Sequence, residues 1–209
     1  MTKVRNLWAG VFFLMVFIFL GILVRSKPTS FDLSVAKFFA AHRTHVEISV
    51  ASFVSTVVAP VVIGTVATVL LVLWYLIKQQ RTAQDVVPIA LIVVAGAAST
   101  LAKSIFHRVR PGATLSTILD AEPSFPSSHT IFIAVAGSTL LFVFAKWHLA
   151  IVAAILVAVV FVGLDRLVLG VHWFTDLLGS GLLSLGLYFL FLYINQSLQP
   201  NPYRRTRVR

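Results

Sequence analysis

Residues 103–129 read KSIFHRVRPGATLSTILDAEPSFPSSH and gather polar and charged side chains between two apolar stretches. Lys103 and Arg110 are seven residues apart, about two helical turns, so both cations are expected on one face of a helix that Pro111 and Gly112 end. Two cations on one face indicate a site for an anion. A basic loop that touches lipid headgroups is the alternative interpretation, and this stretch alone does not separate the two.

The second half of the stretch adds anion-binding groups of another kind. Ser127, Ser128 and His129 follow Pro126 at the expected start of the next apolar run. Helix N-termini favour anions because their first N–H groups are unpaired and lie at the positive end of the helix dipole. The hydroxyls, N–H groups and imidazole of this segment therefore extend the predicted anion site.

The composition is that of an integral membrane protein. Hydrophobic residues make up 58% of the 209 residues and charged residues only 11%, whereas about a quarter of the residues in soluble proteins are charged. The absence of cysteine excludes disulfides, thiolate metal ligands and a cysteine nucleophile. The net charge of +10 is scattered between apolar stretches, so we expect anionic lipids of the bilayer, and no nucleic acid, as its counterpart.

Long uncharged stretches predict transmembrane helices of about 20 residues each. The six expected spans are residues 6–24, 50–77, 86–106, 128–145, 149–164 and 173–194. Together they predict one domain, residues 1–209, that is an all-α bundle of six transmembrane helices. Pro60 is expected to kink the second span, and the polar residues 26–49 indicate a short amphipathic helix along the membrane interface.

The short turn at residues 146–148 makes the spans on either side antiparallel, which returns the chain to the level of His129. There the sequence from Asp165 to Asp176 reads DRLVLGVHWFTD. Ionisable residues inside or at the edge of a span cost about 2.5 to 3.5 kcal/mol each by insertion scales, so Arg166, His172 and Asp176 indicate function. The predicted active site therefore lies at one membrane face.

His172 and Asp176 lie four residues apart, so on a helix the carboxylate can accept one imidazole N–H and leave the other nitrogen unprotonated. A nucleophile or a base needs that state. The lysine and two arginines of the three segments can neutralise a phosphate and its transition state, and His129 can protonate a leaving oxygen. A lone His172 is more often a buried histidine bonded to a carbonyl group, but the whole set favours catalysis.

These segments resemble the three signature motifs of the type 2 phosphatidic acid phosphatase superfamily of membrane lipid phosphatases. The matching residues are Lys103-x6-Arg110-Pro111, then Pro126-Ser127-Ser128-His129, then Arg166-x5-His172-x3-Asp176. The resemblance implies that His172 attacks phosphorus and forms a phosphohistidine, that Asp176 orients it, and that His129 is the general acid. It further implies that no metal or other cofactor is needed and that the phosphoryl oxygens are held by Lys103, Arg110, Ser127, Ser128 and Arg166.

Two positions depart from the family pattern. Ser128 stands where the second motif normally has glycine; it still offers its N–H, although a positive φ there would be strained. Asp165 stands where the third motif normally has serine, and a carboxylate beside a phosphate repels it unless it is paired. We expect Asp165 within about 4 Å of Arg166, Arg108 or Arg110, where it would modulate substrate choice.

The expected substrate is a lipid phosphate of bacterial type, and undecaprenyl diphosphate, phosphatidylglycerophosphate and phosphatidic acid all fit. The rival from another class is an anion or lipid transporter or channel that uses the same cationic cluster for binding only. A transport path needs polar residues at depth in several spans, whereas the ionisable residues cluster at one end of them. The resemblance at the site extends to soluble vanadium haloperoxidases, but the apolar spans argue against a soluble enzyme.

An even number of spans places both termini on one side of the membrane. Once the three site cations are set aside, the terminal side carries the larger number of basic residues: Lys3, Arg5, Lys78, Arg81, Lys146 and the tail residues Arg204, Arg205, Arg207 and Arg209. Because basic residues collect on the cytoplasmic side, we expect cytoplasmic termini and an active site on the extracytoplasmic face of the cell membrane.

Overall fold

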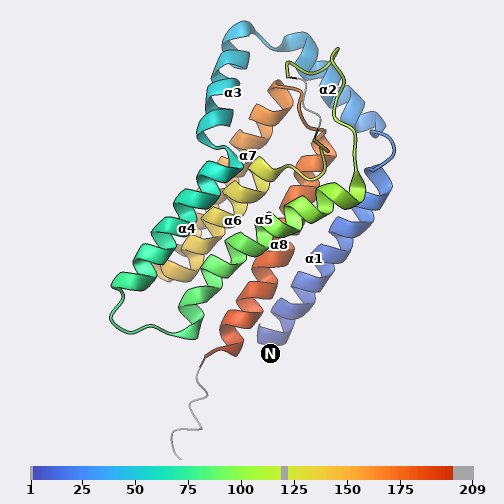
Figure 1. The fold of residues 1–209 in the computed structure, drawn as a ribbon. Helices are drawn as coiled ribbons and strands as arrows, with labels where there is room; N and C mark the ends of the chain where they lie inside the picture. The colour runs from blue at the N-terminus through green and yellow to red at the C-terminus, as the bar shows by residue number, and fades with distance from the viewer. Residues whose placement is uncertain (1, 119–121, 200–209) are drawn as a thin grey trace, which may run out of the picture.

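The computed structural model describes residues 2–118 and 122–199, and this part of the chain is helical without strands (Figure 1). The helices are α1 (Thr2–Val24), α2 (Ser30–His42), α3 (His45–Val57), α4 (Pro60–Ile77), α5 (Val87–Phe106), α6 (Ser128–Val143), α7 (His148–Val168) and α8 (Phe174–Ser197), with 3₁₀ turns at Ala83–Val86 and Ala145–Trp147. Helix α2 lies across one end of the bundle, and α1 begins and α8 ends at the other. The predicted tail arginines lie outside the described residues.

The all-α membrane fold is confirmed, with changes to the predicted spans. Five segments of the described chain are long and apolar enough to cross a membrane, namely Lys3–Val24, His45–Ile77, Ala83–Phe106, His148–Val168 and Phe174–Ser197. Helix α6 is apolar but shorter. The predicted kink at Pro60 is wrong: α3 ends at Val57 and α4 begins at Pro60. Proline suits the first turn of a helix, where its missing N–H has no partner to lose.

Helix α1 packs along α8 through small residues. A Cβ atom on Gly10 would lie 2.7 Å from Cδ2 of Leu190, and one on Gly186 would lie 2.7 Å from Cδ2 of Leu14. Membrane helices associate by such close packing because lipid gives no hydrophobic driving force between them. The two helices therefore lie closely packed against each other.

An aromatic cluster anchors the loop that enters α6. The ring of Phe125 is fully buried and lies 5.4 Å from that of Phe17 on α1 and 5.2 Å from that of Phe106 on α5, centroid to centroid. A Cβ atom on Gly179 of α8 would lie 2.3 Å from Phe125, so glycine makes room for the ring. Since Phe125 immediately precedes the second motif, this packing fixes where α6 begins.

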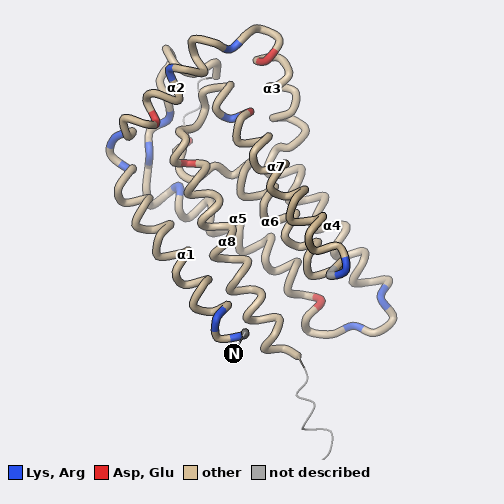
Figure 2. Tube along the Cα trace, turned by 180° about the vertical axis from the view of Figure 1, so that it is seen from behind, with Lys and Arg blue, Asp and Glu red and all other residues tan. Residues whose placement is uncertain are grey.

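Charged residues gather towards the two ends of the bundle, and the middle between them is almost free of charge (Figure 2). Helices α6 and α7 are joined only by the short 3₁₀ turn and run antiparallel, as predicted. The end of α7 therefore returns to the start of α6. This end, beneath α2, holds the three motifs.

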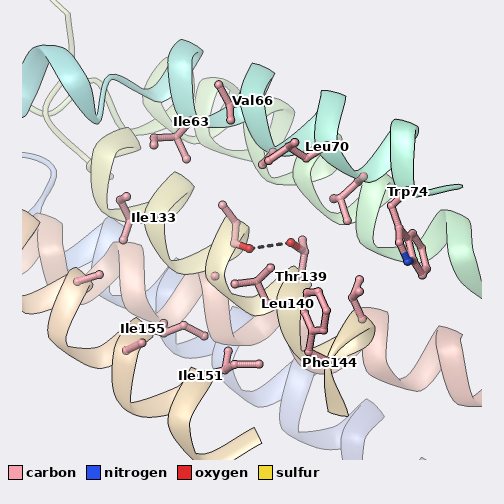
Figure 3. A pocket seen from close by; sticks show the side chains of 17 residues that line it. Ile63, Val66, Leu70, Trp74, Ile133, Thr139, Leu140, Phe144, Ile151 and Ile155 are labelled. Carbon is pink, nitrogen blue, oxygen red and sulfur yellow. Dashed lines mark hydrogen bonds between the residues drawn. The ribbon is translucent and has the colours of Figure 1, made fainter. Parts of the chain in front are cut away.

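An apolar cavity of about 580 Å³ lies between α4, α6 and α7 (Figure 3). Leu70, Ile133 and Ile155 are among its lining residues, and the hydroxyl of Thr139 donates within α6 to the carbonyl oxygen of Ala136 at 2.7 Å. None of the predicted site residues lines it. The cavity suits hydrocarbon, and the charged chemistry lies elsewhere.

A glycine turn brings the third motif back over the end of the bundle. Gly170 has φ +68°, a conformation that side chains disfavour. A Cβ atom there would also lie 2.1 Å from the carbonyl oxygen of Leu115. Only glycine satisfies both conditions, and the turn places His172 over the bundle.

Replacing Gly170 with alanine should therefore destabilise the fold by more than about 1 kcal/mol, because the new Cβ meets both a disfavoured φ and a carbonyl oxygen. Gly181→Ala is the control, since nothing lies within 4 Å of a Cβ at that position. Thermal unfolding of the detergent-solubilised protein at one heating rate compares them. Equal midpoints for the two variants would refute the stated role of the turn.

Candidate active site

The two cations of the first motif do not share a helical face as predicted. Helix α5 ends at Phe106 because His107 adopts a left-handed conformation with φ 46°. Arg110 therefore lies in the segment after the helix. The two cations still converge, since Nζ of Lys103 lies 3.0 Å from a carboxylate oxygen of Glu122 and Nε of Arg110 donates to the Glu122 carbonyl oxygen at 2.8 Å.

Arg110 links the first motif to the third. Its Nη1 donates to the carbonyl oxygen of Val171 at 2.7 Å and lies 3.4 Å from Nε2 of His172. A guanidinium is always charged and can only donate hydrogen bonds. It therefore faces the lone pair of an unprotonated Nε2.

The other imidazole nitrogen faces Asp176. Nδ1 of His172 lies 3.4 Å from Oδ2 of Asp176, as the sequence predicts. The expected helical spacing is wrong, because α8 begins only at Phe174 and His172 precedes it. Oδ2 of Asp176 also accepts the backbone N–H of Trp173 at 2.8 Å, which ties the chain before α8 to its first turn.

The second motif forms the N-terminus of α6. The N–H of Ser127 donates to the hydroxyl of Ser180 at 2.8 Å, and the hydroxyl of Thr130 donates to that of Ser127 at 3.2 Å. The Ser127 side chain makes no capping hydrogen bond to the first turn of α6. Backbone N–H groups there remain without a side-chain acceptor, as an anion site requires.

Ser128 fits its position without the strain that its departure from glycine suggested. Among residues 2–118 and 122–199, positive φ occurs only at His107 and Gly170. The hydroxyl of Ser128 lies 3.1 Å from that of Ser99 on α5, so the side chain points between two helices. Its hydroxyl is thus engaged in packing, which leaves its N–H as the group available to a ligand.

His129 and Arg166 meet beside the α3–α4 junction. Nη1 of Arg166 lies 3.2 Å from Nε2 of His129, which is also 3.3 Å from the carbonyl oxygen of Ser55. Nη2 of Arg166 donates to the Ser55 hydroxyl. The arginine bonds the imidazole when Nε2 is unprotonated, and the carbonyl bonds it when Nε2 carries a proton.

Asp165 is paired as the sequence requires. Its Oδ2 accepts from Nε of Arg166 at 2.9 Å and from Nη2 of the same side chain. Both residues are buried, at 7% and 4% exposure, and Oδ1 of Asp165 has no hydrogen-bond partner in the described structure. The carboxylate offsets one of the three cations of the site.

Comparison with known families identifies this constellation. The family described as the PAP2 superfamily matches residues 85–200, more than half of the chain, including all three motifs. The chain belongs to the PAP2 superfamily. It is accordingly a membrane phosphatase of lipid phosphates.

The fold of this PAP2 protein is similar to that in a crystal structure described as the first transmembrane PAP2 type phosphatidylglycerolphosphate phosphatase from Bacillus subtilis. The two chains are 22% identical, with a TM-score of 0.71, and the likeness covers 97% of this chain and 100% of the other. No curated protein sequence matches this chain significantly.

The PAP2 site includes residues that sequence reasoning missed. Ser55 contacts both His129 and Arg166, and Glu122 contacts both cations of the first motif. Beneath Asp176, a buried network joins Arg108, Asp32 and Thr175. The sequence shows that Asp32 is a charged residue in the polar segment 26–49. It does not show that Asp32 pairs with Arg108, which lies far along the chain.

The PAP2 site holds His172 in its neutral form. Burial lowers the pKa of His172 to about 4, because the cations of Arg110 and Arg166 add to desolvation and outweigh the opposite effect of Asp176. The imidazole is therefore unprotonated around neutral pH. Among residues 2–118 and 122–199, no group of three histidine or acidic side chains is arranged to hold a metal ion.

The titration of His172 should consequently show a midpoint near 4 in the folded protein, against about 6.5 in an unfolded chain. Between those values only the unfolded chain takes up the proton, so the contribution of this group to stability is lost as the pH falls. Selective ¹⁵N-histidine NMR in micelles measures the midpoint, with His172→Gln to assign the signal. A midpoint at 6.5 would rule out the buried, cation-facing imidazole.

Proposed function

We propose that this PAP2 enzyme hydrolyses a lipid phosphomonoester or diphosphate through a phosphohistidine at His172. One observation carries the proposal: Nδ1 of His172 faces the carboxylate of Asp176 while Nε2 faces the guanidinium of Arg110. The carboxylate fixes the proton on Nδ1, and the lone pair of Nε2 points to where a cation would hold a phosphoryl oxygen. Attack forms the N–P bond and breaks the bond from phosphorus to the leaving oxygen.

The phosphoryl oxygens are held by the groups that converge around His172. The positive charge of the lysine and arginines among these groups stabilises the negative charge that is spread over the phosphoryl oxygens in the transition state. The groups are the side chains of Lys103, Arg110 and Arg166, the hydroxyl of Ser127 and the N–H of Ser128. Glu122 can give way to a phosphate, because its side chain is 71% exposed although that of Lys103 is only 14% exposed. A phosphate replaces it on Lys103.

His129 supplies the proton of the leaving group. A protonated Nε2 is stabilised by the carbonyl oxygen of Ser55, and transfer of the proton leaves an unprotonated nitrogen that Arg166 can bond. The neutral His129 then takes a proton from water, whose oxygen attacks phosphorus and breaks the N–P bond. The cycle returns both histidines to their starting states.

A lipid phosphate is the substrate that suits a site at one end of the bundle, since its headgroup reaches that end while its chains stay in the bilayer. Undecaprenyl diphosphate, phosphatidylglycerophosphate and phosphatidic acid all meet this condition. The bias of basic residues supports an active site on the extracytoplasmic face of the cell membrane with cytoplasmic termini. Family membership favours hydrolysis over the transport alternative.

Replacing His172 with alanine should abolish phosphate release from each of these three lipids, because the chain has no cysteine and residues 2–118 and 122–199 show no serine bonded to a carboxylate-backed histidine. Acid-labile phosphate should be trapped on His172 when the wild-type enzyme is quenched during turnover. Activity should survive EDTA, since the cations already supply charge stabilisation. Phosphate trapped on Ser127 or Ser128, or activity restored only by magnesium, would contradict this mechanism.

Replacing Asp165 with serine tests whether this carboxylate affects the preference between diphosphate and monophosphate substrates. The carboxylate reduces the net positive charge that Arg166 presents, so its removal should favour the more highly charged diphosphate. The ratio of kcat/KM for undecaprenyl diphosphate over undecaprenyl monophosphate should rise, by about tenfold for each 1.4 kcal/mol. An unchanged ratio would make Asp165 a structural partner of Arg166 only.

A further inference from the structure

Asp32, which lies outside the three motifs, is linked through Arg108 to Asp176, the partner of His172. Asp32 lies on α2 and is fully buried, with Oδ2 at 2.8 Å from Nη2 of Arg108. Nη1 of the same guanidinium donates to Oδ1 of Asp176. Arg108 is itself only 2% exposed, so one buried guanidinium pairs with two buried carboxylates.

Asp32 has a second connection to α8. Its Oδ1 accepts the backbone N–H of Thr175 at 2.9 Å, and the Thr175 hydroxyl accepts from Nη1 of Arg108 at 2.7 Å. Burial alone would raise the pKa of Asp32, but the N–H groups of Thr175 and Thr29 and the charge of Arg108 hold it below its ordinary value. Asp32 is thus ionised.

The charges of this network decide how Asp176 can act. Two carboxylates around one guanidinium leave one net negative charge, which faces His172. That charge stabilises a ring that becomes positive when Nε2 is phosphorylated while Nδ1 keeps its proton. Without Asp32, the charge of Arg108 would offset Asp176 and weaken this stabilisation.

We propose that Asp32 and Arg108 are positioning residues for the nucleophile, which hold the carboxylate of Asp176 directed at Nδ1 of His172. The proposal rests on the proposed function of His172 and extends it to helix α2. Asp32 touches neither the phosphate nor the reacting atoms. It acts through Arg108 and Asp176, and a change there should alter kcat more than KM.

Asp85 provides a matched control for a purely structural role. Asp32 and Asp85 occupy the same place in a capping box, with Thr29 and Thr82 respectively. Both are buried and both pair with a cation, since Oδ1 of Asp85 lies 2.6 Å from Nζ of Lys78. Asp85 lies in the 3₁₀ turn between α4 and α5, at the end of the bundle opposite α2, and its side chain bonds Lys78 and Thr82.

Four variants test the proposal: Asp32→Asn, Asp85→Asn, Arg108→Gln and the double variant Asp32→Asn/Arg108→Gln. The substrate is whichever of phosphatidic acid, phosphatidylglycerophosphate and undecaprenyl diphosphate the wild type hydrolyses fastest in micelles. Asp32→Asn should lower kcat by on the order of 100-fold with KM nearly unchanged, because the nucleophile is misplaced while the phosphate contacts remain. Asp85→Asn should keep the wild-type kcat.

The double variant separates electrostatic coupling from packing. Arg108→Gln leaves two buried carboxylates without a cation, which protonates or displaces one of them. Removing the charge of Asp32 as well should relieve Asp176, so the double variant should be about tenfold more active than Arg108→Gln alone. If Asp32→Asn alone does not accumulate as a folded protein, the comparison of the double variant with Arg108→Gln decides whether Asp32 acts through its charge.

The proposal is overturned if Asp32→Asn resembles Asp85→Asn in kcat, or if the double variant is no more active than Arg108→Gln. His172→Ala, measured alongside, separates this result from a failure of the proposed function. An inactive His172→Ala with an unaffected Asp32→Asn sinks the positioning role only. An active His172→Ala sinks the phosphohistidine mechanism itself.

Discussion

The carboxylate of Asp176 has no exposed surface and receives donors from three directions. Nδ1 of His172 lies against it, the N–H of Trp173 bonds it, and the guanidinium of Arg108 holds its other oxygen. A buried charge left unpaired costs about 3 to 5 kcal/mol. The arrangement of the chain at this end of the bundle follows from satisfying that one group.

These donors tie two parts of the chain to Asp176, namely the segment that carries Arg108 and the adjacent residues His172 and Trp173. Arg108 carries the segment after α5 and, through Asp32, helix α2. Trp173 joins the same segment from the other side, since its Nε1 donates to the carbonyl oxygen of Val109 at 2.8 Å. The site therefore combines helix ends with the segments after α5 and before α8, and buried hydrogen bonds hold these segments in place.

The outer groups of the site are held more loosely than the inner ones. Lys103 pairs with an exposed carboxylate, and Arg110 is half-buried. His172, Arg166 and Ser127 are buried. Under the proposed mechanism, this gradient would keep His172 preorganised while the outer cations exchange a protein carboxylate for a substrate phosphate.

The sequence by itself determined the membrane class, the helical architecture and the groups that gather at one end, because apolar length and motif spacing are local properties of the chain. It placed Asp165 against an arginine for the same reason, since the two are neighbours. Only the tertiary structure decided that Arg110 leaves the helix at His107, that Pro60 begins a helix, and that Asp32 lies behind Asp176. Asp32 and Arg108 are far apart in sequence, and burial of charge pairs them only after the bundle has formed.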